Sequence, residues 1–102
     1  HLYGLTKVEY LSLVEAQGGK CALCRTPVPN PVKFHVDHDH SCCPVNKSCG
    51  ACVRGLLDRP CNVHLIMGYE RLPLELQDSP RINHYLSQRP VKDLRAGLQL
   101  TP

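Results

Sequence analysis

With 102 residues, the chain is long enough for one domain and little more. It contains no Trp, one Phe, nine Pro and seven Gly, so we expect a thin core and frequent breaks in long elements. The net charge of +3 is compatible with a phosphate-bearing partner, but an ordinary solvated surface would carry it equally well. Charge alone therefore decides nothing.

Seven cysteines offer a way to stabilise so small a domain. A disulfide framework would leave one of them over, whereas C-x-x-C spacing beside histidines favours zinc. The sequence has no recognisable signal peptide and no apolar run long enough to span a bilayer. We therefore expect a zinc-binding intracellular protein, located in the cytoplasm, with no membrane partner.

A first helix is predicted for residues 6–17, where Thr6 and Glu9 have the spacing of a capping box and apolar residues recur at helical intervals. A glycine pair ends it. The knuckle Cys21-Ala-Leu-Cys24 follows, and then a proline-rich stretch that cannot form a central strand.

The next part of the chain predicts a β-hairpin followed by a helix. Residues 32–37 alternate between apolar and polar, as in a short strand, and residues 53–57 can return beside them. The insert 41–52 is rich in cysteine and turn formers and shows no clear periodicity. A helix is expected from about Pro60 to residue 68 or 69, with Phe34, Leu65, Ile66 and Met67 packing the hairpin against it.

The C-terminal part is predicted to be helical. Asp78 or Ser79 can cap a helix with Pro80 at its first position, continuing until Pro90, and residues 91–100 add a short turn or helix. We divide the single domain 1–102 into an N-terminal helix (1–20), a zinc-stapled core (21–70) and a C-terminal helical segment (71–102).

The strongest chemical signal is His35-Val36-Asp37-His38-Asp39-His40, which gathers three imidazoles and two carboxylates at the end of a strand. On a regular strand His38 and His40 share one face, and Asp37 and Asp39 share the other. A turn after the strand would break this alternation and bring Asp37 and His38 into one cleft. A solvated polar loop, or a zinc site with two histidines, would also explain the pattern.

Several motifs in a fixed order resemble the recombination endonuclease VII family of phage HNH nucleases. The likeness extends from the first helix to about Gly68, roughly two-thirds of the chain. The motifs are Cys21-x-x-Cys24, Val36-Asp37-His38-Asp39-His40, Val53-Arg54-Gly55-Leu56-Leu57 and Cys61-Asn62.

This resemblance implies a small α+β fold with a ββα-metal (His-Me finger) core, stapled by zinc and flanked by helices. It implies that Asp37 and Asn62 bind one catalytic divalent cation and that His38 is the general base. His40 matches a further active-site histidine, which would orient or stabilise the scissile phosphate. The implied partner is DNA, the implied setting is a bacterial host cell with a phage-encoded protein, and a homodimer is one option.

The chemistry is consistent with these roles. Hydrolysis of a phosphodiester needs a cation on the phosphate and an activated water, and Mg²⁺ or Mn²⁺ accepts a carboxylate and an amide oxygen while leaving sites open. A neutral histidine can take the proton of the water, and the products would carry a 5′ phosphate. Arg54 and Arg59 either steady phosphate oxygens or are simply exposed.

The zinc ligands show one departure from the family pattern. Cys21, Cys24 and Cys61 match three positions of the structural zinc site, but the fourth position, a cysteine in the family, is Asp58 here. Asp58 can bind zinc through oxygen, and Cys61-x-x-His64 also has ligand spacing. A cysteine of the insert could also fill the position.

The insert itself contains Cys42, Cys43, Cys49 and Cys52, enough for a second tetrahedral zinc site, although two adjacent cysteines make the geometry awkward. The alternative is a single zinc with these thiols free or paired. Two other functions would use the cysteines without catalysis: a zinc-dependent nucleic-acid-binding module and a zinc-ribbon adaptor for proteins. Both leave the acid, amide and histidines without a joint purpose.

Overall fold

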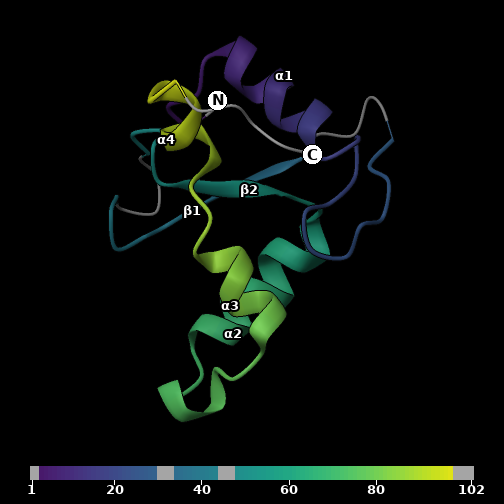
Figure 1. The fold of residues 1–102 in the computed structure, drawn as a ribbon. Coiled ribbons are helices and arrows are strands. Elements are labelled where there is room, and N and C mark those ends of the chain that lie inside the picture. The colour runs from purple at the N-terminus through teal and green to yellow at the C-terminus, as the bar shows by residue number, and fades with distance from the viewer. Residues whose placement is uncertain (1–2, 30–33, 44–47, 98–102) are drawn as a thin grey trace.

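The fold is given by a computed structural model, which describes residues 3–29, 34–43 and 48–97 (Figure 1). A two-stranded antiparallel hairpin lies in the middle of the molecule, with helices on both sides. Its strands are β1 (His35–His38) and β2 (Val53–Leu57). On one side lie α1 (Lys7–Ala16) and α4 (Pro90–Arg95). On the other lie η1 (Cys61–Ile66), α2 (Met67–Glu70), η2 (Leu74–Leu76) and α3 (Pro80–Leu86).

The predicted first helix is confirmed together with its cap. The Thr6 side chain accepts from the Glu9 amide at 3.1 Å, and the Glu9 carboxylate accepts from the Thr6 amide at 2.9 Å. Just past the helix, the Gln17 side chain donates to the Leu56 carbonyl and accepts from the Leu56 amide, at 2.9 and 3.0 Å. This amide group pairs with the free edge of β2 as a neighbouring strand would, and so fixes α1 to the hairpin.

The hairpin is confirmed, with β1 at residues 35–38; residues 32 and 33 of the predicted strand lie outside the described residues. Asp37 pairs with Gly55 and His38 with Val53, so the register shifts between Asp37 and His38. The extra residue of this bulge is Arg54 on β2, so the alternation of side chains breaks on β2, all five residues of which are buried. Asp37 and His38 are also both buried, with 4% and 2% of their surfaces exposed, and helices lie on both sides of the hairpin.

Two apolar clusters pack on the hairpin, in agreement with the expectation of a thin core. One combines α1, β2 and α4, and the other combines the cysteine knuckle, β2, the helix after it and α3. The first contains Leu5, Leu13, Val53, Leu56 and Val91, and the second contains Cys21, Leu23, Leu57, Cys61, Ile66 and Tyr85.

The helix expected near Pro60 is present as η1 followed directly by α2, but the predicted packing is only partly right. Ile66 is buried, whereas Leu65 and Met67 are 42% and 39% exposed. Successive helical residues point about 100° apart, so three in a row cannot all face the hairpin. Phe34 packs instead against the apolar cluster of α1, β2 and α4.

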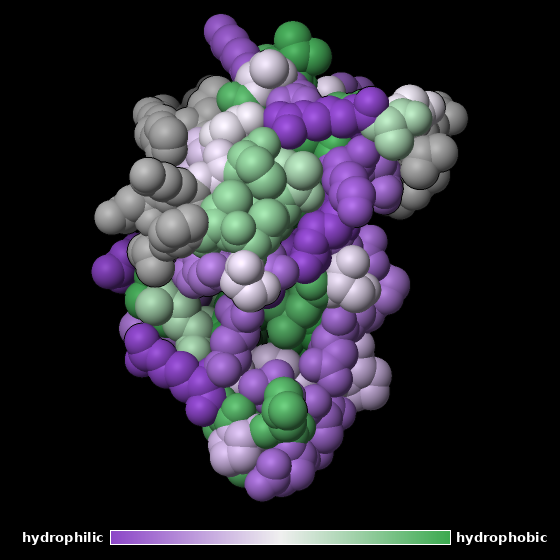
Figure 2. Space-filling model, turned by 90° about the vertical axis from the view of Figure 1, so that its left-hand side faces the viewer, coloured by the Kyte–Doolittle hydropathy of each residue, from purple (hydrophilic) through white to green (hydrophobic). Residues whose placement is uncertain are grey.

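The C-terminal helices follow the prediction in part. Ser79 caps α3 by accepting from the Ile82 amide at 3.2 Å, and α3 ends at Leu86, short of the predicted Pro90, which instead begins α4. Residues 98–100 of the last predicted segment lie outside the described residues. Exposed leucines around η2, at the lower tip of Figure 1, contribute to the apolar (green) surface there in Figure 2. Within the described ranges, every helix is too short or too polar to cross a membrane.

We expect Arg95→Ala to lower the free energy of unfolding by about 1–2 kcal/mol, because several hydrogen bonds at the surface are lost together. The Arg95 guanidinium of α4 contacts the Glu9 carboxylate at 2.7 and 3.0 Å and the carbonyls of Gly4 and Cys49 at 2.9 Å. Urea denaturation measures the change. The exposed Lys92→Ala on the same helix is the control, and equal stability of the two variants would contradict the prediction.

Candidate functional site

The predicted structural zinc ligands form one cluster. The sulfurs of Cys21, Cys24 and Cys61 and a carboxylate oxygen of Asp58 all lie within 4.8 Å of one another. The knuckle is closed by the Cys21 amide, which donates to the Thr26 carbonyl, and by the Arg25 amide, which donates to the Cys21 carbonyl. A left-handed backbone at Arg25 (φ 62°) allows this tight turn. Three thiolates and one carboxylate suit a closed tetrahedral Zn²⁺ site.

The Asp58 carboxylate makes two contacts at this site. One carboxylate oxygen accepts from the Cys61 amide at 2.9 Å, as an N-cap of the following helix does, and the other contacts the Cys24 sulfur at 3.0 Å. Burial alone would raise the pKa of Asp58, but hydrogen bonds from Cys24 and Cys61 lower it below its ordinary value. The side chain is therefore held ionised with one oxygen directed at the thiols.

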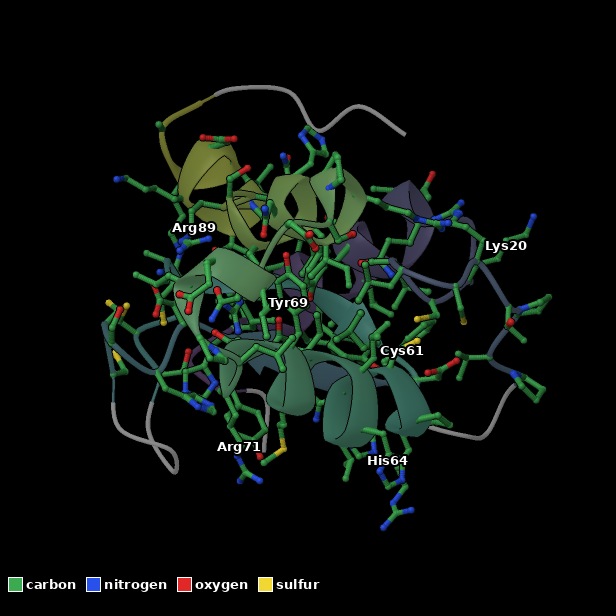
Figure 3. All side chains as sticks on the ribbon, turned by 90° about the horizontal axis from the view of Figure 1, so that it is seen from below. Lys20, Cys61, His64, Tyr69, Arg71 and Arg89 are labelled. Atoms are coloured by element: carbon green, nitrogen blue, oxygen red, sulfur yellow. The ribbon has the colours of Figure 1, made fainter. Side chains whose placement is uncertain are left out.

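His64, the alternative fourth ligand, is not a member of this cluster. Its side chain is exposed, and in Figure 3 it lies on the outer side of the helix that carries Cys61. The insert cysteines do not fill the fourth position either, because they form a cluster of their own. The geometry favours Asp58.

The predicted metal-binding acid, Asp37, is buried in a network of hydrogen bonds. Arg54 donates to both of its oxygens, at 3.0 and 3.1 Å, and the Tyr85 hydroxyl donates to one of them at 2.7 Å. Burial and the Asp37 charge raise the pKa of Tyr85 well above its ordinary value, so the hydroxyl keeps its proton and acts as a donor. A carboxylate has about four acceptor positions, so these three bonds leave roughly one for a cation.

Arg54 is buried as well, with 4% of its surface exposed, so the expectation that it is simply exposed is wrong. Besides Asp37 it contacts both oxygens of Glu70 at 3.1 Å and the His38 carbonyl at 3.3 Å. Burial alone would lower its pKa, but Glu70 and Asp37 raise it. Arg59, in contrast, is exposed, as one of its two interpretations expected.

Asn62, the predicted second metal ligand, lies against the same strand. Its amide nitrogen contacts the Nδ1 atom of His35 at 3.1 Å. His35 and Asp37 are two residues apart on β1, before the bulge, so they share a face and lie roughly 7 Å apart along it. The contact uses the amide nitrogen, and the amide oxygen is the atom with which Asn62 could bind a cation.

His38 and His40 lie together, in agreement with their predicted common face. Their ring centroids are 4.6 Å apart in an edge-on arrangement, and the Tyr3 ring lies 5.7 Å from His38 on another side. His38 is buried whereas His40 is exposed. A solute approaching this end of the hairpin therefore meets His40 before His38.

The turn that carries His40 is fixed by Asp39. One carboxylate oxygen accepts from the amide and the hydroxyl of Ser41 at 2.9 and 2.6 Å, and the other forms an ion pair with Arg89 at 2.9 Å. The Ser41 bonds, with support from the charges of Arg89 and Arg54, lower the pKa of Asp39. Asp39 and Asp37 therefore have different hydrogen-bond partners.

The insert contains the second cysteine cluster. The sulfurs of Cys42, Cys43, Cys49 and Cys52 lie within 4.8 Å of one another. Hydrogen bonds among them, and from the local backbone, lower the pKa of Cys49 to about 7 and raise that of Cys42 to about 12. All seven cysteines are unpaired, so the structure has no disulfide framework.

Three contacts of the site were missed by sequence reasoning: Tyr85 and Glu70 around Asp37 and Arg54, and His35 beside Asn62. His35 belongs to the histidine-rich motif of residues 35–40, but no role was predicted for it. Tyr85 follows Asp37 by 48 residues and reads in the sequence only as an apolar position of a helix. Nothing local in the sequence connects them.

The geometry defines a class of protein: a small α+β domain in which a bulged hairpin carries an acid and histidines and lies beside two thiol-rich clusters that could each hold a metal ion. The sequence model of the family "Recombination endonuclease VII" matches residues 1–87, and the chain belongs to this family.

Two curated relatives are phage proteins. The chain is 35% identical over 89 residues to the Gene 59 protein of Mycobacterium phage D29, covering 87% of this chain and 47% of that protein. It is 36% identical over 64 residues to the Gene 59 protein of Mycobacterium phage L5, covering 63% and 34%. The chain thus spans less than half the length of each. No solved structure matches it.

If Asp58 is the fourth zinc ligand, Asp58→Ala weakens zinc binding, whereas His64→Ala leaves it unchanged. The loss combines a missing ligand with a missing helix cap, so we expect at least about a tenfold lower affinity. Competition with a chromophoric chelator measures it. Asp58→Cys, which restores the ligand type of the family, should bind at least as tightly as the original chain. Release of zinc from His64→Ala but not from Asp58→Ala would reverse the assignment.

Proposed function

We propose that this chain is a metal-dependent DNA endonuclease with a ββα-metal core, formed by β1, β2 and the helix from η1 to α2. Membership of the recombination endonuclease VII family supports this proposal. The observation that carries it is the arrangement at the bulge, where Arg54 bonds to the Asp37 carboxylate and to the His38 carbonyl, and the buried His38 ring lies against the exposed His40.

Asp37 and Asn62 are the residues that would hold the catalytic cation, Mg²⁺ or Mn²⁺. Their donor atoms are oxygens, which such hard ions prefer; Asp37 lies on β1 two residues after His35, and Asn62 contacts His35. When bound, the ion would offset negative charge on the phosphate and on the departing 3′ oxygen.

In this proposal His38 is the general base. A neutral imidazole accepts one proton from water, the resulting hydroxide forms a bond to phosphorus, and the bond from phosphorus to the 3′ oxygen breaks. The 3′ oxygen takes a proton from solvent, and the products carry a 5′ phosphate and a 3′ hydroxyl. Because His38 is buried, with the Tyr3 and His40 rings beside it, bulk water would have little access to its ring.

His40 is assigned to the scissile phosphate because it is the exposed imidazole of the pair. For Arg54 we modify the expectation of a phosphate contact. Its bonds to Asp37, Glu70 and the His38 carbonyl support a positioning role, in which Arg54 fixes the orientation of the metal-binding carboxylate. Phosphate contacts from exposed Arg59 remain part of the proposal.

The partner proposed is DNA, in the cell of a bacterial host, since both curated relatives are phage proteins. A homodimer would supply two active sites for paired cuts, and exposed leucines around η2 offer an apolar surface for it. A zinc-dependent module that binds nucleic acid without cutting it is the competing function, and the following experiment separates the two.

We expect the purified chain to nick supercoiled plasmid in Mg²⁺ or Mn²⁺, and chelator to abolish the nicking. His38→Ala should lower the rate by about 10²-fold or more while DNA binding, measured by gel shift, is retained. The exposed His84→Ala is the matched control and should cut normally. Binding without nicking by the unmodified chain would favour the non-catalytic module, and normal nicking by His38→Ala would remove the general-base assignment.

Tyr85→Phe tests the positioning of Asp37. Loss of the hydroxyl removes one of three hydrogen bonds to this carboxylate. The metal concentration at half-maximal nicking should therefore rise by about 10-fold, with little change in DNA binding. A metal titration of nicking measures the shift. Tyr69→Phe, which also removes a hydroxyl with hydrogen bonds but away from Asp37, is the control. Equal titration curves for the two variants would exclude this role.

A further inference from the structure

The four cysteines of the insert have the spacing of metal ligands rather than of disulfide partners. The Cys42 sulfur lies 3.9 Å from the sulfurs of both Cys49 and Cys43. Four sulfurs at about 2.3 Å from one tetrahedral zinc lie about 3.8 Å apart, whereas a disulfide bond measures about 2.05 Å. The adjacent cysteines, which seemed awkward in the sequence, thus direct both sulfurs to the same point.

This cluster is joined to the proposed active site through the backbone of Asp39. The Asp39 carbonyl accepts from the amides of Cys42 and Cys43 at 3.1 and 3.2 Å, and the Asp39 amide donates to the Cys52 carbonyl at 3.1 Å. Three of the four cysteines therefore form backbone hydrogen bonds with Asp39, the residue between His38 and His40.

The fourth, Cys49, is held from outside the insert. Its carbonyl accepts from Arg95 of α4 at 2.9 Å. The cluster consequently connects the end of β1, the start of β2 and the last described helix. The turn between Asp39 and Cys43 is exposed or half-buried, and apart from these bonds it is held by the Asp39 carboxylate contacts with Ser41 and Arg89. A cross-link through the four cysteines would restrict it further.

We propose that Cys42, Cys43, Cys49 and Cys52 bind a second Zn²⁺ and that this ion positions His40 against His38. The zinc site follows from the sulfur geometry alone. Its effect on catalysis rests on the proposed function, because it acts through His40. His40 follows Asp39 directly, and the ion fixes Asp39 through three backbone hydrogen bonds.

The experiment counts zinc by elemental analysis in the purified, reduced chain after dialysis against zinc-free buffer. We expect two ions per chain in the unmodified protein, one in Cys49→Ser and two in Cys49→His, because an imidazole also binds zinc. Cys49 is exposed, so both substitutions can be accommodated. Cys49→His is the matched control, since it changes the same residue but keeps a ligand.

Nuclear magnetic resonance of the histidine rings tests positioning without requiring cleavage. The His40 ring signals, assigned with His40→Ala, should shift in Cys49→Ser and stay in place in Cys49→His. Nicking should fall about tenfold in Cys49→Ser and recover in Cys49→His.

A single zinc in the unmodified chain, or an equal count in Cys49→Ser, would overturn the second site. A mass lower by two hydrogens under non-reducing conditions would identify a disulfide instead. Unchanged His40 signals after loss of the second ion would remove the positioning role. None of these results depends on nuclease activity, so failure of the proposed function would be recognised separately, by absent nicking with the zinc count intact.

Discussion

The buried guanidinium of Arg54 is the group on which the geometry of the site depends. It connects Asp37 on β1, Glu70 at the end of α2 and the backbone of His38 at the bulge. Removing one partner of a buried ion pair typically costs about 3–5 kcal/mol, because the remaining charge is left without compensation. Arg54 thus ties the hairpin to the helix after it, in addition to the apolar cluster of Leu57, Cys61 and Ile66 and the contact of Asn62 with His35.

The bulge gives Arg54 its place. Asp37 pairs with Gly55 and His38 with Val53, so Arg54 is the extra residue of β2 opposite these two, and its side chain reaches the Asp37 carboxylate and the His38 carbonyl. Asp37 and His38 are both buried, while the following turn carries His40 into the solvent. Irregular pairing next to a chemical site is common, because it redirects side chains that the regular ladder cannot bring together.

The two cysteine clusters lie at opposite ends of this short hairpin. One joins the N-terminal knuckle to the point where β2 ends and the helix begins, and the other joins the turn after β1 to the start of β2. A two-stranded hairpin is at best marginally stable in water, and the apolar clusters here are small. Metal ligation at both ends would confine the backbone where packing alone is weak. It would also make the site sensitive to thiol oxidation, which a purely apolar core is not.

Much of the local structure follows from the sequence itself. The capping box of Thr6 and Glu9, the Ser79 cap with Pro80, and the C-x-x-C knuckle each depend on residues close together in the chain. The order of motifs also identified the family, which the match over residues 1–87 confirms. The assignments of Asp37, His38, His40 and Asn62 to catalysis came from that resemblance and stay predictions.

Only the tertiary structure decided how distant residues combine. It selected Asp58 over His64 as the geometric fit to the zinc cluster, showed Leu65 and Met67 to be exposed, and placed Tyr85 and Glu70 around Asp37 and Arg54. These outcomes depend on how each helix returns to the hairpin and, for Arg54, on the irregular pairing of β2 opposite Asp37 and His38. Local patterns specify periodicity and caps, whereas which long-range partners meet is set by packing across the whole domain.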